Sequence, residues 1–367
     1  MKTVILSCLL AWAVLSFGAD ASSISPPKEV KAALAAHDRA IHVKDGWIRD
    51  PYMIKGPDGY FYLTGTTLLS TTKETPEVKY SSGPPGHELH AWKTKDFIHW
   101  KSLGTPYSLK DGIWFSAKPE RFKEVSESNW RLWAPEFHFI NGKCAVIHTS
   151  PGPVNGANLS LARGLEPRRP WLNPMGAQVG QRHDPSLFQN DDGTWWMIWA
   201  GTSIAPLKSD LSDFAAEPID IGPSGEIKQV GYEGCLMRKI AGKYILFGTA
   251  WSTGKGRKGS YNLYYATADK ITGPYGERRF AGRFLGHGTP FQDNAGRWWC
   301  TAFFNANVPP LSRDGIQSRD LSQTAQTVNE QGLTLVPLEV KPGANDILIR
   351  AIDPAYMNPG PDELQKF

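Results

Sequence analysis

Cysteine is scarce in this chain of 367 residues, which contains four. Cys8 lies in the apolar N-terminal stretch, and the other three, Cys144, Cys235 and Cys300, are widely spaced within apolar, strand-like patterns. We expect those three to be buried free thiols, because an odd number at such spacing does not form a disulfide framework. The sequence is therefore not that of a small disulfide-dependent domain.

Runs of lysine or arginine are also missing, although 40 basic and 36 acidic side chains leave a net charge of +4. Without such a run, nucleic acid is not an expected partner. Beyond residue 21 no apolar segment reaches the roughly 20 residues that a membrane-spanning helix needs. Hydrophobic residues make up 41% of the chain and charged residues 21%, so it has the balance of a globular protein with a full core.

The apolar stretch at residues 4–17 follows Lys2 and precedes the small residues Ala19 and Ala21. This order is typical of a secretory signal peptide, and the stretch is too short for a membrane anchor. We predict that residues 1–21 are removed after Ala21 and that the protein is exported, to the periplasm or out of the cell.

Glycine, proline and aromatic residues are abundant, with 36 Gly, 28 Pro, 14 Trp, 12 Tyr and 16 Phe. This composition favours short strands joined by tight turns over long helices. One pattern of strand, glycine-containing turn and aromatic strand occurs five times, at residues 50–65, 135–149, 184–201, 233–249 and 289–304. Each copy predicts a β-hairpin, and a further strand-like segment follows each hairpin.

Anchor residues of the last four hairpins, Glu136, Asp184, Glu233 and Thr289, are 48, 49 and 56 residues apart, a spacing typical of propeller blades. The longer interval before them indicates an insertion that includes residues 81–88 and 106–128. A radial ring of sheets hides their edges, so we predict an all-β fold, a five-bladed β-propeller over residues 46–340. The alternative, a β-sandwich, does not require a near-constant period.

Shorter segments flank the predicted propeller. An alanine-rich helix is expected at residues 26–40, within an N-terminal segment spanning 22–45. Strands are expected at 332–340 and 347–352, and residues 341–367 form a C-terminal extension. This tail can close the ring or reach a partner subunit.

Four acidic residues stand near the start of the first strand of successive repeats: Asp50, Glu136, Asp184 and Glu233. Inner strands of a propeller begin near its axis, so we expect these side chains to converge there. Carboxyl groups held close together raise one another's pKa, which lets one be protonated while another is ionised. Hydrolysis of a glycosidic bond uses such a pair, as proton donor and as base for water.

Other residues near these acids suit a sugar-binding pocket. Trp133, Tyr232 and Trp251 offer aromatic rings that can stack on a sugar, although most aromatic residues must fill the core. His183 and Arg49 directly precede Asp184 and Asp50, so we expect them to orient those acids or to contact sugar hydroxyls.

Six segments resemble glycoside hydrolase family 117, a family of five-bladed propellers related to family 43. They are IRDPYMIKGPDGYFYLTGTT (48–67), HDPSLF (183–188), YEG (232–234), LFGTAWST (246–253), GSYNLYYATADKITGPYG (259–276) and GRFLGHGTPF (282–291). The resemblance extends over residues 41–311. It implies exo-release of 3,6-anhydro-L-galactose from agar-derived neoagaro-oligosaccharides by an inverting mechanism, with Asp50 as general base and Asp184 and Glu233 as the other acids of the pocket.

One position departs from that family. Its agar-active members have histidine, the proposed general acid, directly before the glutamate, whereas this chain has Tyr232. Tyrosine has an ordinary pKa near 10 against about 6.5 for histidine, so it is a poorer proton donor near neutral pH. Either Glu233 donates the proton, as its counterpart does in family 43, or the protein acts on another substrate.

The resemblance also implies a cation and a dimer. In both families a histidine near the axis helps to hold a central cation, directly or through water, and His287 is the matching residue. We expect one divalent cation there, no organic cofactor and no zinc site. Dimers with exchanged N-terminal helices are typical of family 117, so a homodimer through the N-terminal segment is expected.

Two other functions remain open at this point. The chain can be a carbohydrate-binding propeller without catalytic activity, or an arabinofuranosidase or xylosidase of the family 43 type. The anomeric outcome depends on the distance between Asp50 and the proton donor, because a separation of about 6.5–9.5 Å is that of inverting enzymes and one near 5 Å that of retaining enzymes.

Overall fold

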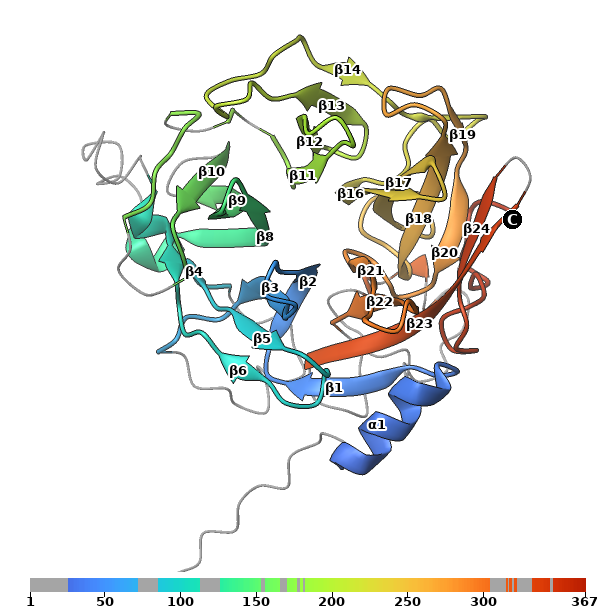
Figure 1. Ribbon diagram of the computed structural model, residues 1–367. Helices are drawn as coiled ribbons and strands as arrows, with labels where there is room; N and C mark the ends of the chain where they lie inside the picture. Colours follow the sequence, from blue (N-terminus) through green and yellow to red (C-terminus); the bar gives the residue numbers. More distant parts are fainter. Residues whose placement is uncertain are drawn as a thin grey trace, which may run out of the picture.

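The computed structural model describes residues 26–71, 85–112, 126–152, 156–165, 170–176, 179–180, 182–303, 315, 317–318, 320–321, 332–343 and 346–367. Within these residues, five antiparallel sheets stand around one axis (Figure 1). The predicted all-β, five-bladed propeller is confirmed. The predicted signal peptide lies outside the described residues, as does most of the predicted insertion at 81–88 and 106–128.

The first four blades follow one another along the chain. Blade I comprises β2 (Ile48–Lys55), β3 (Phe61–Thr67), β5 (Trp92–Thr94) and β6 (Lys101–Ser102). Blade II comprises β8 (Arg131–Ile140), β9 (Lys143–Gly152) and β10 (Gly156–Ala162). Blade III comprises β11 (Ser186–Gln189), β12 (Trp195–Trp199), β13 (Ser203–Pro206) and β14 (Ile219–Asp220). Blade IV comprises β16 (Glu233–Ile240), β17 (Lys243–Trp251), β18 (Tyr261–Ala268) and β20 (Arg279–Gly282).

Smaller elements lie in the connections within and between the blades. β4 (Glu88–Leu89) pairs with β7 (Tyr107–Ser108), and β15 (Pro223–Ser224) pairs with β19 (Tyr275–Glu277). Two short 3₁₀ helices span Leu109–Asp111 and Glu127–Asn129.

Blade V joins the two ends of the described chain. Its strands β21 (Pro290–Gln292), β22 (Trp298–Ala302) and β23 (Gly332–Pro342) are antiparallel, and β1 (Ile41–Asp45) pairs with β23. β24 (Ile347–Ala351) pairs with the other half of β23. The two predicted C-terminal strands are therefore present, and pairing between an N-terminal and a C-terminal strand closes the ring, so no blade edge is left open there.

Helix α1 (Pro27–Ala36) confirms the expected N-terminal helix, and it ends at His37, which adopts a left-handed conformation with φ 52°. The helix buries Val30, Ala33 and Leu34 in the core shared by blades I and V. The His37 ring lies edge-on to Trp299, with 4.5 Å between ring centroids. The helix is thus fixed to its own propeller, beside β1 (Figure 1).

Among the residues that the structure describes, the core forms five clusters, one at each boundary between neighbouring blades. Representative pairs of residues from the two sides are Phe61 and Phe291, Tyr62 and Phe137, Ile147 and Leu187, Ile198 and Leu246, and Phe247 and Val336. Five boundaries are what a closed ring of five blades requires. Cys144, Cys235 and Cys300 are buried and free, as predicted.

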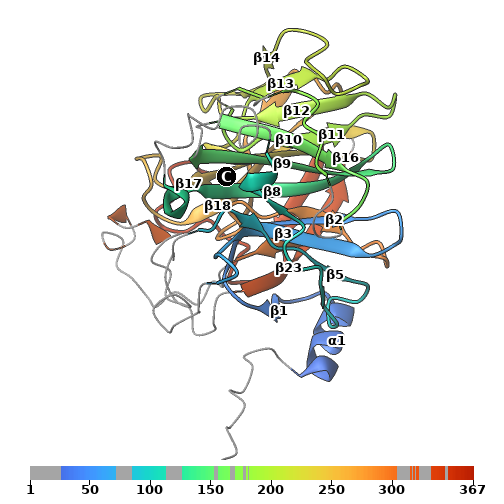
Figure 2. The same cartoon turned by 90° about the vertical axis from the view of Figure 1, so that its left-hand side faces the viewer.

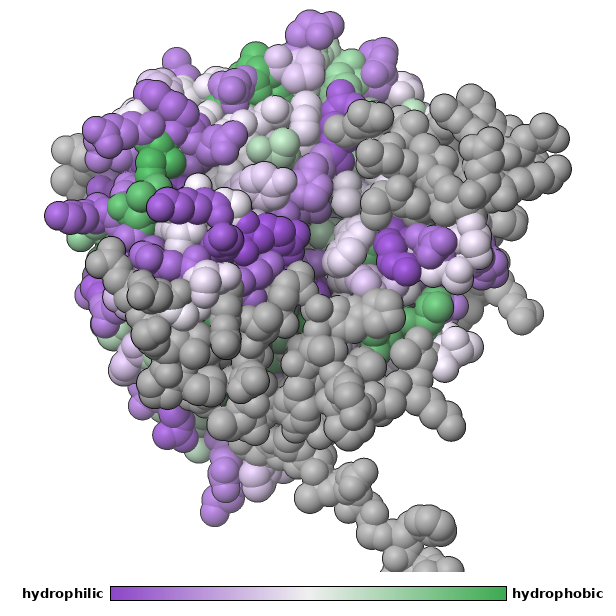
Figure 3. Space-filling view, turned by 180° about the vertical axis from the view of Figure 1, so that it is seen from behind, coloured by the Kyte–Doolittle hydropathy of each residue, from purple (hydrophilic) through white to green (hydrophobic). Residues whose placement is uncertain are grey.

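The side view in Figure 2 places α1 at one edge of the molecule, next to β1. On the face seen in Figure 3, apolar side chains among the coloured residues occur in small separate groups. Within the described part of the chain, no helix is long and apolar enough to cross a membrane.

Candidate active site

The inner strands of blades I, II and IV share a bulge where they approach the axis. In each, three residues span the interval that two residues span on the neighbouring strand: Arg49 to Tyr52, Trp133 to Glu136, and Glu233 to Leu236. The second residue of each bulge has a positive φ: 50° for Asp50, 44° for Ala134 and 59° for Gly234. A bulge with this conformation bends the strand and redirects the side chains near it.

The sequence predicted that the four acids occupy equivalent positions in their repeats, but the bulges show that their positions differ. Asp50 and Asp184 each adopt the left-handed conformation, Asp184 with φ 44°, and each precedes a proline. Their counterpart in blade II is Ala134. Glu136 stands two residues further along its strand, and Glu233 one residue before its left-handed position. A pattern of acid plus proline or glycine does not distinguish these registers, which is why the sequence placed all four together.

Asp50, Asp184 and Glu233 nevertheless meet at the axis, joined by two histidines. Nδ1 of His287 lies 3.3 Å from Oδ1 of Asp50 and 3.7 Å from Oδ2 of Asp184. Nε2 of His183 lies 3.5 Å from Oδ2 of Asp184 and 3.1 Å from Oε2 of Glu233. The result is an alternating row of carboxylates and imidazoles with Asp184 at its centre.

Asp50 is held by the strand beside it. The Thr66 hydroxyl donates a hydrogen bond to Oδ2 of Asp50 at 2.7 Å and accepts one from the Ala134 backbone N–H at 2.8 Å. Asp50 is buried, so this bond and the contact with His287 fix its orientation. A carboxylate positioned in this way is suited to accept a proton from water.

Glu233 has two partners for its two oxygens. Burial opposes its ionisation, but hydrogen bonds from His183 and from the Tyr261 hydroxyl, the latter 2.6 Å long, outweigh burial and hold the pKa of Glu233 below its ordinary value. In turn, the bond to Glu233 raises the pKa of His183 to about 9 against the effect of burial. At neutral pH the proton of this pair therefore resides mainly on His183.

Asp184 and His287 are buried and shifted by their neighbours. Burial raises the pKa of Asp184, and the adjacent Glu233 and Asp50 add to the rise, while the two histidines oppose it. For His287, burial favours the neutral ring, but Asp50 and Asp184 outweigh burial and raise its pKa. The site thus contains both a carboxyl group that resists ionisation and one that is readily ionised.

Three of the other predicted residues lie around this cluster without a direct bond to its acids. Glu136 lies 2.8 Å from Nε2 of His138 and accepts a hydrogen bond from Ser186 at 2.9 Å. Arg49 is buried, with its guanidinium 4.9 Å from the centre of the Phe303 ring. Trp133 is half-buried at the strand position that Glu233 occupies in blade IV.

The remaining predicted aromatic residues border Glu233. Tyr232 is 60% exposed, and its ring lies 6.2 Å from His183 and 5.9 Å from Trp251, centroid to centroid. Trp251 packs on Tyr261 at 4.5 Å. Together they form an aromatic wall beside the acids.

Sequence reasoning missed Thr66 and Tyr261, which position Asp50 and Glu233. Thr66 lies on β3, which pairs with the inner strand β2, and Tyr261 lies on β18, which pairs with β17. Only the register of these strands brings the two side chains to the axis. A threonine or tyrosine in a β-strand is otherwise an ordinary core residue, so their types gave no signal.

The three closest ligand atoms of His183, Asp184 and Glu233 lie within 4.8 Å of one another. That spacing suits a metal ion. His287, the residue expected to hold a cation, contacts Asp50 and shares Asp184 with this group. The residues present therefore fit a divalent cation, with carboxylate oxygens as its ligands.

Hydrolysis of a glycosidic bond requires a protonated group as proton donor and an ionised carboxylate as base for water, and the carboxyl groups around this axis differ in that way. A site of this kind is the one that glycoside hydrolysis requires. Residues 42–313 match the model of glycosyl hydrolases family 43, and the chain belongs to that family.

Other proteins resemble the chain in sequence or in fold. The β-D-galactofuranosidase xynD of Aspergillus niger is 27% identical over 202 residues, which are 50% of this chain and 54% of that protein. The chain thus matches about half the length of this relative. Two solved structures share the fold: the family 43 protein BlXynB of Bacillus licheniformis (TM-score 0.56, 19% identity, 87% of this chain and 58% of that one) and an α-L-arabinofuranosidase of Clostridium thermocellum (TM-score 0.53, 16% identity, 86% and 96%).

Proposed function

We propose that this enzyme releases a terminal sugar from an oligosaccharide, with Asp50 as general base and the His183–Glu233 pair as proton source. The row of Asp50, His287, Asp184, His183 and Glu233 is the observation that supports this assignment. It places an oriented carboxylate at one end and a protonated pair at the other.

In the proposed reaction, water attacks the anomeric carbon and passes a proton to Asp50. The bond from that carbon to the glycosidic oxygen breaks, and the oxygen receives a proton from the His183–Glu233 pair and leaves as an alcohol. Asp184, in contact with both histidines, tunes the protonation of the two ends.

His183 stores the proton and Glu233 is the group that we expect to deliver it, across their 3.1 Å contact. The alternative donor is the Tyr232 hydroxyl. Glu233→Gln, His183→Asn and Tyr232→Phe separate these roles when kcat/KM is followed against pH. Loss of the alkaline limb only in Tyr232→Phe would transfer the donor role to the phenol.

The sugar that we propose is 3,6-anhydro-L-galactose or a related galactose-type unit of algal oligosaccharides. The resemblance to family 117 supports it, and the relative named as a galactofuranosidase supports a galactose-type unit more broadly. The structural likeness to an arabinofuranosidase keeps furanosides and xylosides as the second candidate.

A panel of neoagaro-oligosaccharides, galactofuranosides, arabinofuranosides and xylosides tests both. Release of a single terminal sugar from the first two groups supports the proposal. Turnover restricted to arabinosides or xylosides would replace the substrate, and binding without turnover of any member would make the protein a carbohydrate-binding propeller.

We further propose export by the signal peptide, a homodimer and one divalent cation held by His287. N-terminal sequencing of the secreted protein should begin at Ser22 if the first holds. The molar mass measured by light scattering tests the dimer. In this structure helix α1 packs on its own blades, so the variant to compare is one that lacks the N-terminal segment. The cation would supply positive charge that balances the carboxylates near His287.

A further inference from the structure

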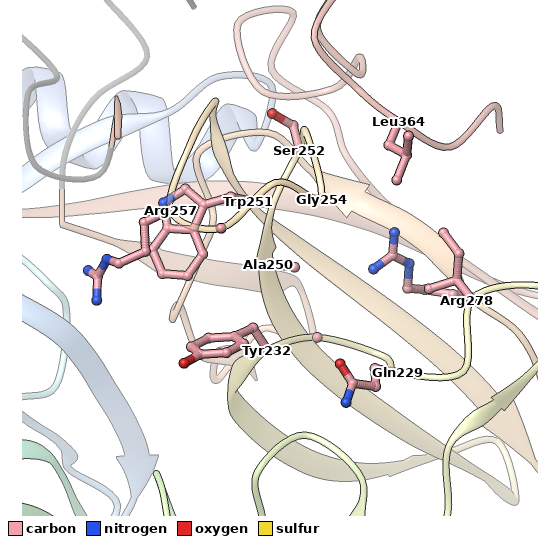
Figure 4. A pocket seen from close by; sticks show the side chains of 12 residues that line it. Gln229, Tyr232, Ala250, Trp251, Ser252, Gly254, Arg257, Arg278 and Leu364 are labelled. Atoms are coloured by element: carbon pink, nitrogen blue, oxygen red, sulfur yellow. The ribbon is translucent and has the colours of Figure 1, made fainter. Parts of the chain in front are cut away.

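A cleft of about 380 Å³ opens beside the catalytic cluster, along the rim of blade IV (Figure 4). Tyr232 and Trp251 form the side nearest the axis, and Gln229, Arg278 and Leu364 lie toward the other end. The C-terminal tail builds the outer wall, because the Leu364 N–H donates a hydrogen bond to the Ser252 carbonyl at 2.8 Å.

The cleft is continuous with the groups that surround Glu233. Tyr232 directly precedes Glu233 and faces the His183 ring at 6.2 Å, centroid to centroid. Trp251 packs on Tyr261, whose hydroxyl donates a hydrogen bond to the Glu233 carboxylate. A saccharide with its scissile bond at Glu233 therefore has its next unit beside these two rings.

Arg278 is the unusual residue of this cleft. Its side chain extends toward the cleft in Figure 4, although the residue is only 8% exposed. Among the described residues no carboxylate oxygen lies within 4.0 Å of its guanidinium, and its Nε donates to the Gln365 side-chain amide at 3.0 Å. Burial lowers the pKa of Arg278 despite the more distant Glu363. The guanidinium also lies over the Tyr264 ring, 4.2 Å from its centroid, so an aromatic face but no carboxylate offsets its charge. An anion in the cleft would give this buried cation the ion pair that it lacks.

A second guanidinium stands at the catalytic end of the cleft. Arg257 lies over the Trp251 ring, 4.6 Å from its centroid, and bonds Asp320 at 3.2 Å. Its side chain is 52% exposed. The cleft is therefore aromatic along one wall and has a guanidinium at each end, of which only that of Arg257 is paired with a carboxylate, a combination that suits a sugar ring carrying an acidic substituent.

We propose that this cleft binds a saccharide unit that carries an anionic group, a sulfate ester or a carboxylate, with Arg278 as the residue that binds the anion. This inference rests on the proposed function, because the unit in the cleft is the neighbour of the one that is released.

Binding measurements by titration calorimetry test it on two pairs of oligosaccharides. One pair differs only by a sulfate ester on the unit next to the terminal sugar, and the other contains a uronic acid or its parent hexose there. The Asp50→Asn variant prevents turnover during the titration. We expect the anionic member of at least one pair to bind about ten- to hundredfold more tightly, the gain typical of a charge-assisted contact. The pair that shows it identifies the source of the anion.

Arg278→Gln should abolish this preference, and Arg278→Lys should keep part of it. Arg279→Gln is the matched control, since Arg279 is the next residue of β20 and pairs with Asp346 instead. A circular dichroism spectrum and a melting temperature like those of the wild type show that each variant is folded.

Equal affinity for both members of both pairs, or a preference that survives in Arg278→Gln, would overturn the inference while leaving the proposed function in place. If none of the four oligosaccharides binds, the proposed function fails together with the inference.

Discussion

Replacing Tyr261 by phenylalanine removes one hydroxyl from the centre of the site and nothing else. That hydroxyl donates the 2.6 Å hydrogen bond to Glu233, and Tyr261 is 1% exposed. A hydrogen bond to a charged group contributes about 1.5–3 kcal/mol, and a buried carboxylate that loses its donor does not regain it from water. We expect the variant to lose about that much free energy of unfolding at pH 7.

The pH dependence of this loss has a definite sign. The pKa of Glu233 is lower in the folded protein than its ordinary value, so Glu233 stabilises the fold above the unfolded pKa, about 4.3, and loses this contribution as pH falls through the folded pKa. Because Tyr261 is one cause of the lowering, the deficit of Tyr261→Phe should be largest near neutral pH and shrink in acid. The pKa of Glu233 in the variant should rise.

Tyr264→Phe provides the control. It lies on the same strand, is fully buried and donates a 2.7 Å hydrogen bond to Glu363 in the C-terminal tail, away from the acids. Denaturant unfolding should show a comparable loss in both variants. The pH profile of kcat/KM should shift upward only in Tyr261→Phe, and identical profiles in the two variants would refute the assignment of Glu233 to proton transfer.

Two further changes address the backbone and the cation. Gly234→Ala places a Cβ 2.8 Å from the His287 ring at a position with φ 59°, so it should lower kcat/KM and the free energy of unfolding. Gly242→Ala is the control, because its φ is 82° and no atom lies within 4 Å, so it should cost about 1–2 kcal/mol by conformation alone. Equal losses of the two variants in denaturant unfolding would contradict the close contact at Gly234. Chelation with EDTA should lower both the activity and the melting temperature, and added Ca²⁺ should restore both. His287→Ala should be insensitive to this treatment. A wild-type protein unaffected by EDTA would exclude the cation.

The fold could be predicted because its signal is repeated. Each hairpin couples a glycine turn with aromatic and apolar strands, and five copies at a near-constant spacing leave few architectures that bury their faces. β1 escaped prediction because Ile41–Asp45 is short and follows the helix directly. Its role depends on pairing with β23, about 290 residues away, which local pattern does not reveal.

The site could be predicted only in part. Asp50 and Asp184 share a visible motif, an acid before proline at the start of an inner strand, and the structure brings them to one place. The bulge registers that separate Glu136 from the cluster depend on one extra residue in a strand, and the sequence does not mark it. His183 was expected to orient Asp184, but its contact with Glu233 crosses from blade III to blade IV.

The most direct test of the account is the activity of Asp50→Asn on the best substrate of the panel. Asparagine keeps the shape of Asp50 and can still accept the hydrogen bond from Thr66, but it cannot take a proton from water. We predict that kcat/KM falls by about 10²–10⁴-fold while oligosaccharide binding persists. A variant that hydrolyses the substrate as fast as the wild type would contradict the central role of the axial carboxylates.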